Sequence, residues 1–269
     1  MTRVTLLLTS LFINSSAMAH GGEDTRHDGV ILQEGTDYET CYIDFHSELT
    51  QKQYREFNSE WGSAYAFTPQ SGPTVLGTGN VQFSGVLRSV AIDDGKDSWN
   101  NTWTHPTADH WLGPVQLPIL SARVGLTPAL DIETMFSFGN ANWAIGGVGL
   151  RHTLLTQDDD MPLDLSLREH VQVTRGGSAW ANVSVGADVS VGRTFELGTR
   201  LITATPYLAA GASSGLGIES DDDVDLKNAI SFSPRATAGL ELAVGPARLG
   251  IEGSVADINQ YAFHVGASF

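Results

Sequence analysis

The chain has 269 residues, which suits one large domain or two small ones, and its single cysteine, Cys41, excludes an internal disulfide. It carries 15 Lys and Arg residues against 31 Asp and Glu residues, and this net charge of −16 argues against nucleic acid as a partner. No run of about 18 or more apolar residues is present, so no transmembrane helix is predicted.

The start of the chain has the pattern of an export signal. Arg3 precedes the apolar run VTLLLTSLFI, and Ala17 and Ala19 form the small-x-small motif that signal peptidase recognises. We therefore expect residues 1–19 to be a signal peptide and the mature protein to be exported, with a short buried helix as the alternative. Cys41 is expected to be a half-buried apolar residue, with an intermolecular disulfide as the alternative.

Residues 20–75 are expected to form a periplasmic N-terminal segment with one short helix. Its first part, 20–40, is polar and acidic, which is typical of a flexible lead-in. The stretch CYIDF (41–45) favours a short strand. The stretch TPQSGP (68–73) is typical of a linker, because proline and glycine interrupt regular structure.

The helix is predicted over 51–61. Thr50 and Gln53 have the capping-box spacing, in which each side chain satisfies a backbone donor near the other residue, and Gly62 is expected to end the helix. Three aromatic residues recur at helical spacing and form one stripe: Tyr54, Phe57 and Trp61. We expect this helix either to plug the barrel described below or to lie on the periplasmic membrane surface, with simple packing against CYIDF as a third reading.

From about Leu76 onward, apolar and polar residues alternate with period two, which is the pattern of strands with one apolar and one polar face. The clearest example is 181–192, where valines and alanines alternate with small or polar residues. The expected fold is an all-β, antiparallel, up-and-down transmembrane β-barrel over residues 76–269. Its ten strands are expected near 77–93, 116–126, 128–138, 142–155, 162–174, 179–192, 201–215, 229–244, 247–256 and 260–269.

The connections between these strands alternate in length. LTPAL and VGPAR form tight joins, whereas DDGKDSWNNTWTHPTADHWLG and GIESDDDVDLKNA are long polar loops. An up-and-down order places both long loops on one side and both ends of the barrel on the other.

The polar parity of the strands carries charges of both signs, which we expect to pair across a narrow lumen. This lumen charge network consists of Arg88, Arg123, Arg151, Arg168, Arg235, Arg248, Asp131, Glu133, Asp164, Asp188, Glu241 and Glu252. A face in water would also accept such charges, so a soluble two-sheet sandwich is the alternative fold. Glu169 falls on the apolar parity, and a β-bulge or a place at the aqueous rim would explain it.

A sheet in a bilayer must bond every backbone polar group internally, and an even number of antiparallel strands achieves this by closing into a barrel. The expected strands have about the ten residues needed to cross. Aromatic residues near strand ends are expected to form interfacial girdles: Trp99, Trp103, Trp111, Trp143, Trp180, Tyr207 and Tyr261.

The export signal, the paired tight and long connections, and a last strand ending HVGASF resemble Gram-negative outer-membrane β-barrel proteins. In that family the last strand closes the barrel against the first, and its C-terminal aromatic is part of a signal for the outer-membrane assembly machinery. The resemblance implies this role for Tyr261, Phe263, Val265 and Phe269. The stretch CYIDFHSELTQKQYREFNSEWG also resembles the lead-in of a small group of uncharacterised proteobacterial outer-membrane proteins, and implies no activity.

His170 is the main catalytic candidate, because Glu169 is adjacent and Ser166 lies on the same parity. Two same-face steps along a strand separate Ser166 from His170 by about 13 Å, which is too far for a hydrogen bond. We therefore expect no catalytic residue and place His170 in the lumen network. A lipid hydrolase on the barrel wall is the alternative.

Two loops and the mature N-terminus hold candidate metal ligands, and solvated side chains are the default expectation for all of them. The candidates are His105, Asp109 and His110 in the first loop, Asp221, Asp222, Asp223 and Asp225 in the second, and His20 with His27 at the N-terminus. No metal site and no cofactor are expected, although divalent cations at the acidic loops remain candidate partners.

The expected function is that of a non-enzymatic protein of the Gram-negative outer membrane, with a structural or narrow-pore role. Its expected partners are outer-membrane lipid, lipopolysaccharide and the barrel assembly machinery. A surface-binding protein that acts through its acidic, Trp-rich loops, including 95–113, is a further alternative.

Overall fold

The computed structural model describes residues 42–43, 45–92, 96–104, 115–138, 143–158, 160–176, 180–221 and 224–269. The expected signal peptide, the acidic lead-in and Cys41 lie outside the described residues. So do several candidate ligands and Trp111: His20, His27, His105, Asp109, His110, Asp222 and Asp223.

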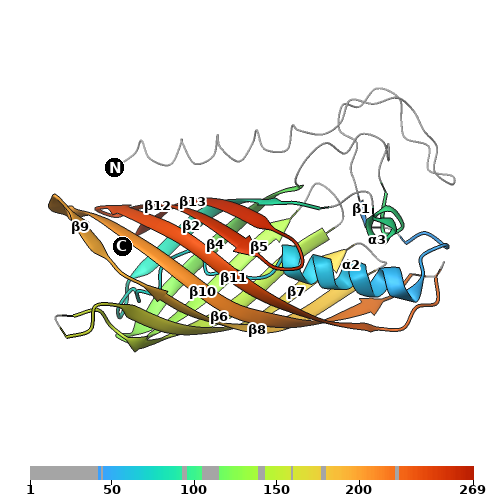
Figure 1. Ribbon diagram of the computed structural model, residues 1–269, viewed down its shortest axis with the longest axis horizontal. Coiled ribbons are helices and arrows are strands. Elements are labelled where there is room, and N and C mark those ends of the chain that lie inside the picture. The colour runs from blue at the N-terminus through green and yellow to red at the C-terminus, as the bar shows by residue number, and fades with distance from the viewer. Residues whose placement is uncertain are drawn as a thin grey trace, which may run out of the picture.

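Ten antiparallel strands of the described chain close into a barrel (Figure 1). Each barrel strand pairs with the next barrel strand along the chain, and the last strand, β13, pairs with the first, β2, to close the sheet. The strands are β2 (Val81–Val90), β4 (Val115–Thr127), β5 (Leu130–Phe138), β6 (Trp143–Leu155), β7 (Asp164–Gly176), β8 (Trp180–Gly192), β10 (Thr199–Glu219), β11 (Ala229–Val244), β12 (Ala247–Val255) and β13 (Gln260–Ser268). The predicted ten-stranded barrel is confirmed, and the two-sheet sandwich is wrong.

The barrel has two distinct ends. We call the end with loops 91–114 and 220–228 the loop end, and the opposite end the turn end; they lie at the right and left of Figure 1. Turns of two residues at 128–129 and 245–246 close the turn end, where Val81 and Phe269 also exchange backbone hydrogen bonds of 2.9 Å. The predicted sides of the long loops and of the barrel ends are confirmed. The alternation in length is only partial, because 139–142 is short and 156–163 is longer.

Short elements extend both ends. At the turn end, β9 (Phe195–Leu197) pairs with the extended start of β10. At the loop end, α3 (Asp97–Asn100) lies in the first long loop, and β1 (Tyr42–Ile43) pairs with β3 (Trp103–Thr104). The strand expected at CYIDF is therefore present as β1.

The barrel wall is polar inside and apolar outside. On β8, Ser184 and Asp188 are buried in the lumen, whereas Val183 and Val185 face outward and are exposed. Each barrel strand exposes at least one large apolar side chain: Phe83, Leu120, Phe136, Val148, Val171, Val185, Leu208, Phe232, Ile251 and Phe263. Exposure of so large an apolar surface to water is unfavourable, whereas the outer wall of a barrel in a bilayer must be apolar. The fold is thus a transmembrane β-barrel.

Glu169 is an exception on the outer wall. Its side chain is exposed in the middle of β7, between the outward-facing Leu167 and Val171. It pairs in regular register with Leu150 on β6 and Ala187 on β8, so of the two explanations considered above, the β-bulge is wrong.

The N-terminal helix α2 (Gln51–Ala64) begins as predicted. The Thr50 hydroxyl accepts from the Gln53 N–H at 3.3 Å, and the Gln53 amide oxygen accepts from the Thr50 N–H at 2.8 Å, so the capping box is confirmed. Gly62 does not end the helix, which continues to Ala64. None of the helices in the described ranges is long and apolar enough to span a membrane.

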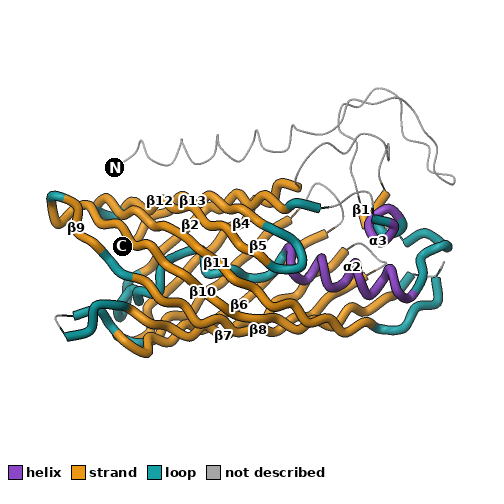
Figure 2. The backbone as a smooth tube through the Cα atoms, viewed as in Figure 1, coloured by secondary structure: helices purple, strands orange, loops and turns teal. Residues whose placement is uncertain are grey.

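From α2 to Pro73, the N-terminal segment lies inside the barrel. Helix α2 occupies the loop end, where it packs against β8, β10 and β11 (Figures 1 and 2). Residues 60–73 are all buried. Of the two main readings of the helix, the plug is correct. Within the expected N-terminal segment (20–75), α2 and the residues that follow it fill the lumen, because the aromatic stripe and the backbone carbonyls find partners there.

Candidate functional site: a lumen closed by the chain's own N-terminal segment

The polypeptide that follows α2 runs along the lumen in an extended path. We call residues 65–73 the lumen strap. Every residue of the strap is buried, although the stretch TPQSGP within it was expected to be a linker. Two prolines prevent it from forming a helix, so its carbonyl groups need hydrogen-bond donors from elsewhere.

Arginine side chains of the wall supply those donors. Arg88 donates to the carbonyls of Ala64 at 3.3 Å and Ala66 at 2.8 Å, and to the Thr68 hydroxyl at 2.8 Å. Arg151 donates to the carbonyls of Gly72 and, at 3.0 Å, of Pro69. The planar guanidinium carries five donors in a fixed fork, which suits it to hold several acceptors along an extended chain.

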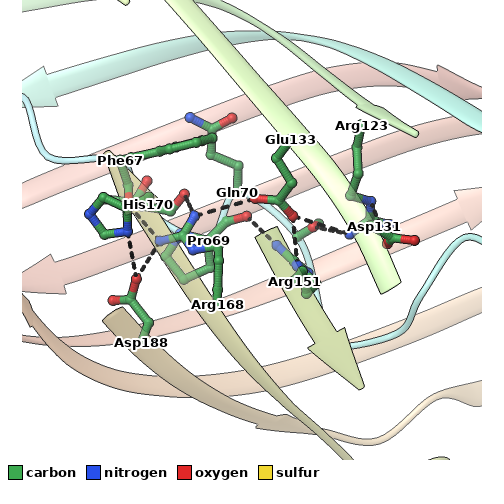
Figure 3. A network of polar contacts seen from close by, with 12 residues as sticks. Phe67, Pro69, Gln70, Arg123, Asp131, Glu133, Arg151, Arg168, His170 and Asp188 are labelled. Atoms are coloured by element: carbon green, nitrogen blue, oxygen red, sulfur yellow. Dashed lines mark hydrogen bonds and ion pairs between the residues drawn. The ribbon is translucent and has the colours of Figure 1, made fainter. Parts of the chain in front are cut away.

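Arg168 links the strap to the wall at the centre of the network. It donates to the carbonyls of Phe67 and Thr68 and to the Asp188 carboxylate, and its guanidinium carbon lies 4.9 Å from the centroid of the Phe67 ring (Figure 3). One arginine therefore meets the strap through both hydrogen bonds and the face of an aromatic ring.

Asp188 balances two of these arginines. It accepts from Arg168, and its other oxygen lies 2.7 Å from a guanidinium nitrogen of Arg235. The His170 Nδ1 is 3.7 Å from the same carboxylate, and its ring meets Phe67 edge-on at 5.8 Å between centroids. A buried carboxylate without such partners would be strongly unfavourable.

A second group of ion pairs lies nearer the turn end. Glu133 has a carboxylate oxygen 2.7 Å from Arg151 and lies within 4.0 Å of Arg123 and Arg168. Asp131 lies 3.4 Å from Arg123 and also accepts from the Leu76 N–H at 3.3 Å. The two groups share Arg168, so the charges form one connected network (Figure 3).

Two further acidic residues bind the N-terminal segment directly. Glu252 accepts from the backbone N–H of Gln70 at 3.0 Å and from the Tyr207 hydroxyl at 2.8 Å. Asp164 accepts from the Thr74 hydroxyl at 3.1 Å. Carboxylates of the wall thus accept hydrogen bonds from donors of the segment, and arginines of the wall donate hydrogen bonds to its carbonyls.

The remaining two members of the expected network lie apart from its centre. Arg248 and Glu241 are only half-buried. Arg248 donates to the Gly245 carbonyl at the turn end, at 3.4 Å. Neither residue forms a salt bridge with another member among the described residues. The other ten members are buried in the lumen.

An aromatic cluster surrounds α2 at the loop end. Phe57 meets Trp99 at 5.2 Å and Trp180 at 5.4 Å between ring centroids, both in edge-on geometry. Trp61 stacks on Tyr65 at 3.9 Å and meets Trp143 at 6.2 Å. All of these rings are buried. The helix therefore closes the loop end by hydrophobic packing.

The expected interfacial girdle is accordingly wrong for four of its members. Trp143, Trp180 and Tyr207 are buried on the lumen face of their strands, and Trp99 of α3 is buried against α2, whereas Tyr261 faces outward and is exposed. Trp143 shares its strand parity with Arg151 on β6, and Trp180 shares its parity with Asp188 on β8. The parity of the strands therefore contained the signal that these rings point inward.

Polar contacts also fix α2 to the wall. The Asn58 amide donates to the Ala229 carbonyl at 3.1 Å and accepts from Asn182 at 2.8 Å, which joins the helix to β11 and β8. A side chain at Gly217 would place its Cβ 2.2 Å from the Asn58 amide oxygen. The absence of a side chain at this position on β10 lets the helix approach.

The space left beside the strap is small. A cavity of about 20 Å³ lies between Gln70, Ser71, Gln82 and Ser121. Such a volume holds about one water molecule. A cavity of this size is too small for a solute larger than water.

Ser166 and His170, the two residues weighed above as a catalytic pair, have different partners in the structure. The Ser166 hydroxyl is paired with that of Ser190 at 2.7 Å, while His170 contacts Asp188 and Phe67. No group of three or more His, Cys, Asp or Glu side chains in the described ranges can hold a metal ion.

The four residues of the proposed assembly signal lie on or just beyond β13. Tyr261, Phe263 and Phe269 are exposed, and Val265 is half-buried on the same parity. The strand that carries them pairs with β2, so it does close the barrel.

No protein-family model and no curated protein matches the chain. Similar solved structures include outer-membrane β-barrels and a designed transmembrane β-barrel. They include the β-domain of the Bordetella autotransporter BrkA, with 11% identity over 71% of this chain and 99% of that chain and a TM-score of 0.44. The N-terminal barrel of Pseudomonas aeruginosa OprF has 9% identity over 72% and 99%, with a TM-score of 0.29. Ail of Yersinia pestis has 12% identity over 71% and 99%, with a TM-score of 0.28. At these scores the likeness concerns the type of fold and not an activity.

Proposed function

We propose that the protein is a non-enzymatic, integral protein of the Gram-negative outer membrane whose barrel is sealed by its own N-terminal segment. The observation that carries the proposal is the unbroken burial of residues 60–73 within the lumen. A barrel of ten strands has little interior space, and here an extended chain and a network of charged side chains occupy it. A structural or anchoring role is therefore favoured over a diffusion pore.

The location is supported by several independent features. These are the export-signal pattern at residues 1–19, the closed antiparallel sheet, its apolar outer wall, and the nature of the similar solved structures. Outer-membrane lipid and lipopolysaccharide would contact the wall. The assembly machinery would read Tyr261, Phe263, Val265 and Phe269, as the resemblance to such barrels implies.

Electrical recording tests whether the barrel is sealed. The purified protein is inserted into planar lipid bilayers, and its single-channel current is compared with that of a variant that lacks residues 51–72. We predict no stable conductance for the intact protein and discrete conducting steps for the deletion variant, because the plug is removed. A boiling-dependent shift in gel mobility serves as the control that each protein is a folded barrel.

Steady conductance by the intact protein, at the level of the deletion variant, would contradict the proposal. A variant shortened in the loop at 220–228 provides the matched control, because it removes residues at the same end without emptying the lumen. It should remain non-conducting.

A further inference from the structure

The order of contacts along the N-terminal segment gives the direction in which it passes through the barrel. At the turn end, the backbone N–H of Gly79 donates to Gly125 at 2.8 Å, beside the start of β2. Farther inside, Arg151 holds Gly72, and Arg88 holds Ala66. At the loop end, the Gln51 amide donates to the Lys227 carbonyl at 2.9 Å. The segment therefore runs the length of the lumen.

The residues before α2 are held at the loop end. Tyr42 and Ile43 pair with Thr104 and Trp103 of the first long loop. The His46 N–H donates to the Asn101 carbonyl at 3.0 Å. Tyr42, Ile43 and His46 therefore lie among the long loops, at the opposite end from the start of β2.

We infer that the chain is threaded through its own barrel, so that the described residues just before α2 lie at the outer surface of the cell. The inference rests on the proposed outer-membrane location. In bacterial barrels of this type the short turns face the periplasm and the long loops face outward. The two-residue turns and both ends of the barrel lie together here, which assigns the turn end to the periplasm and the loop end to the exterior.

Thiol labelling of intact cells tests the threading. In a Cys41→Ser background, single cysteines are introduced as Ser47→Cys, just before α2, as Asp225→Cys in the loop at 220–228, and as Pro128→Cys in a turn; all three positions are exposed. Cells are treated with a polyethylene-glycol maleimide too large to cross the outer membrane. We predict that S47C is labelled in intact cells to the same extent as D225C. P128C should stay unlabelled in intact cells and should react only after the outer membrane is permeabilised.

Two results would overturn the inference. In the first, the S47C variant stays unlabelled in intact cells while the D225C variant reacts. In the second, the P128C variant reacts in intact cells. The proposed location fails separately, if the protein is not recovered in the outer-membrane fraction and shows no boiling-dependent mobility shift.

Discussion

Asp188 illustrates how single residues close the lumen. This buried carboxylate contacts Arg168 and Arg235, and both of these arginines also donate to the Phe67 carbonyl of the strap. The strap is thus held by cations that are themselves neutralised by the wall. Removing the carboxylate would leave two buried guanidinium groups with less compensation.

We predict that Asp188→Asn destabilises the barrel. The change keeps the size of the side chain but removes its charge, and breaking a buried ion pair in this way costs about 3–5 kcal/mol. The free energy of unfolding would be measured by urea titration in lipid vesicles. Asp225→Asn, at an exposed loop position, is the matched control and should change stability by less than about 0.5 kcal/mol. If both substitutions changed the free energy of unfolding equally, the claim that Asp188 stabilises the barrel through its buried ion pairs would be contradicted.

At this scale the sequence predicted which charged residues face inward, but not what they bind. Strand parity follows directly from the alternation of apolar and polar residues, and it places Arg88, Arg151 and Arg168 in the lumen. Their acceptors include carbonyls of residues 64–72, which are far away in the sequence. Side-chain alternation carries no information about an extended segment that crosses the interior, so this part required the three-dimensional structure.

Helix α2 contributes a stripe of buried aromatic side chains to the hydrophobic core. Its stripe of Tyr54, Phe57 and Trp61 is fully buried against rings from the first long loop, β6 and β8. The helical periodicity predicted the stripe and the capping residue Thr50, because both depend on local spacing. It did not determine the surface that the stripe covers, since a membrane surface and a barrel mouth both accept an amphipathic helix.

Trp61→Ala should loosen the plug. Replacing a fully buried tryptophan leaves a cavity among the neighbouring rings and costs about 3–5 kcal/mol. We expect a lower unfolding midpoint and a weaker near-ultraviolet circular dichroism signal from the aromatic cluster. Arg55→Ala, on the exposed face of the same helix, is the control. An unchanged midpoint for the Trp61 variant would show that the helix does not pack as described.

The ten strands were predicted within a few residues, whereas the aromatic girdle was not. Strand positions follow from a period-two pattern that both membrane and lumen enforce along the whole wall. Proximity to a strand end, the criterion used for the girdle, ignores which face a ring occupies. Trp143 and Trp180 lie near strand ends but on the lumen face, where they pack around α2.

At the scale of the whole molecule, the wall and the plug are joined by many polar contacts. The lumen face of the barrel is too polar and too charged to be left dry without partners, and residues 51–76 supply them. The same contacts explain why the chain, rather than solvent or a solute, fills the interior. The proposals of a sealed barrel and of a threaded N-terminal segment rest on this arrangement.

A designed disulfide tests the position of the strap most directly. A Cβ built on Gly72 lies 3.6 Å from the Thr205 Cβ on β10, within the range of about 3.5–4.5 Å that a disulfide requires. In a Cys41→Ser background, Gly72→Cys with Thr205→Cys should cross-link under mild oxidation, as detected by mass spectrometry of the joined peptides. Gly72→Cys with Leu208→Cys, which faces outward, should not. Failure of the first pair to cross-link in the folded barrel, with both thiols freely reactive, would contradict the account that the strap fills the lumen.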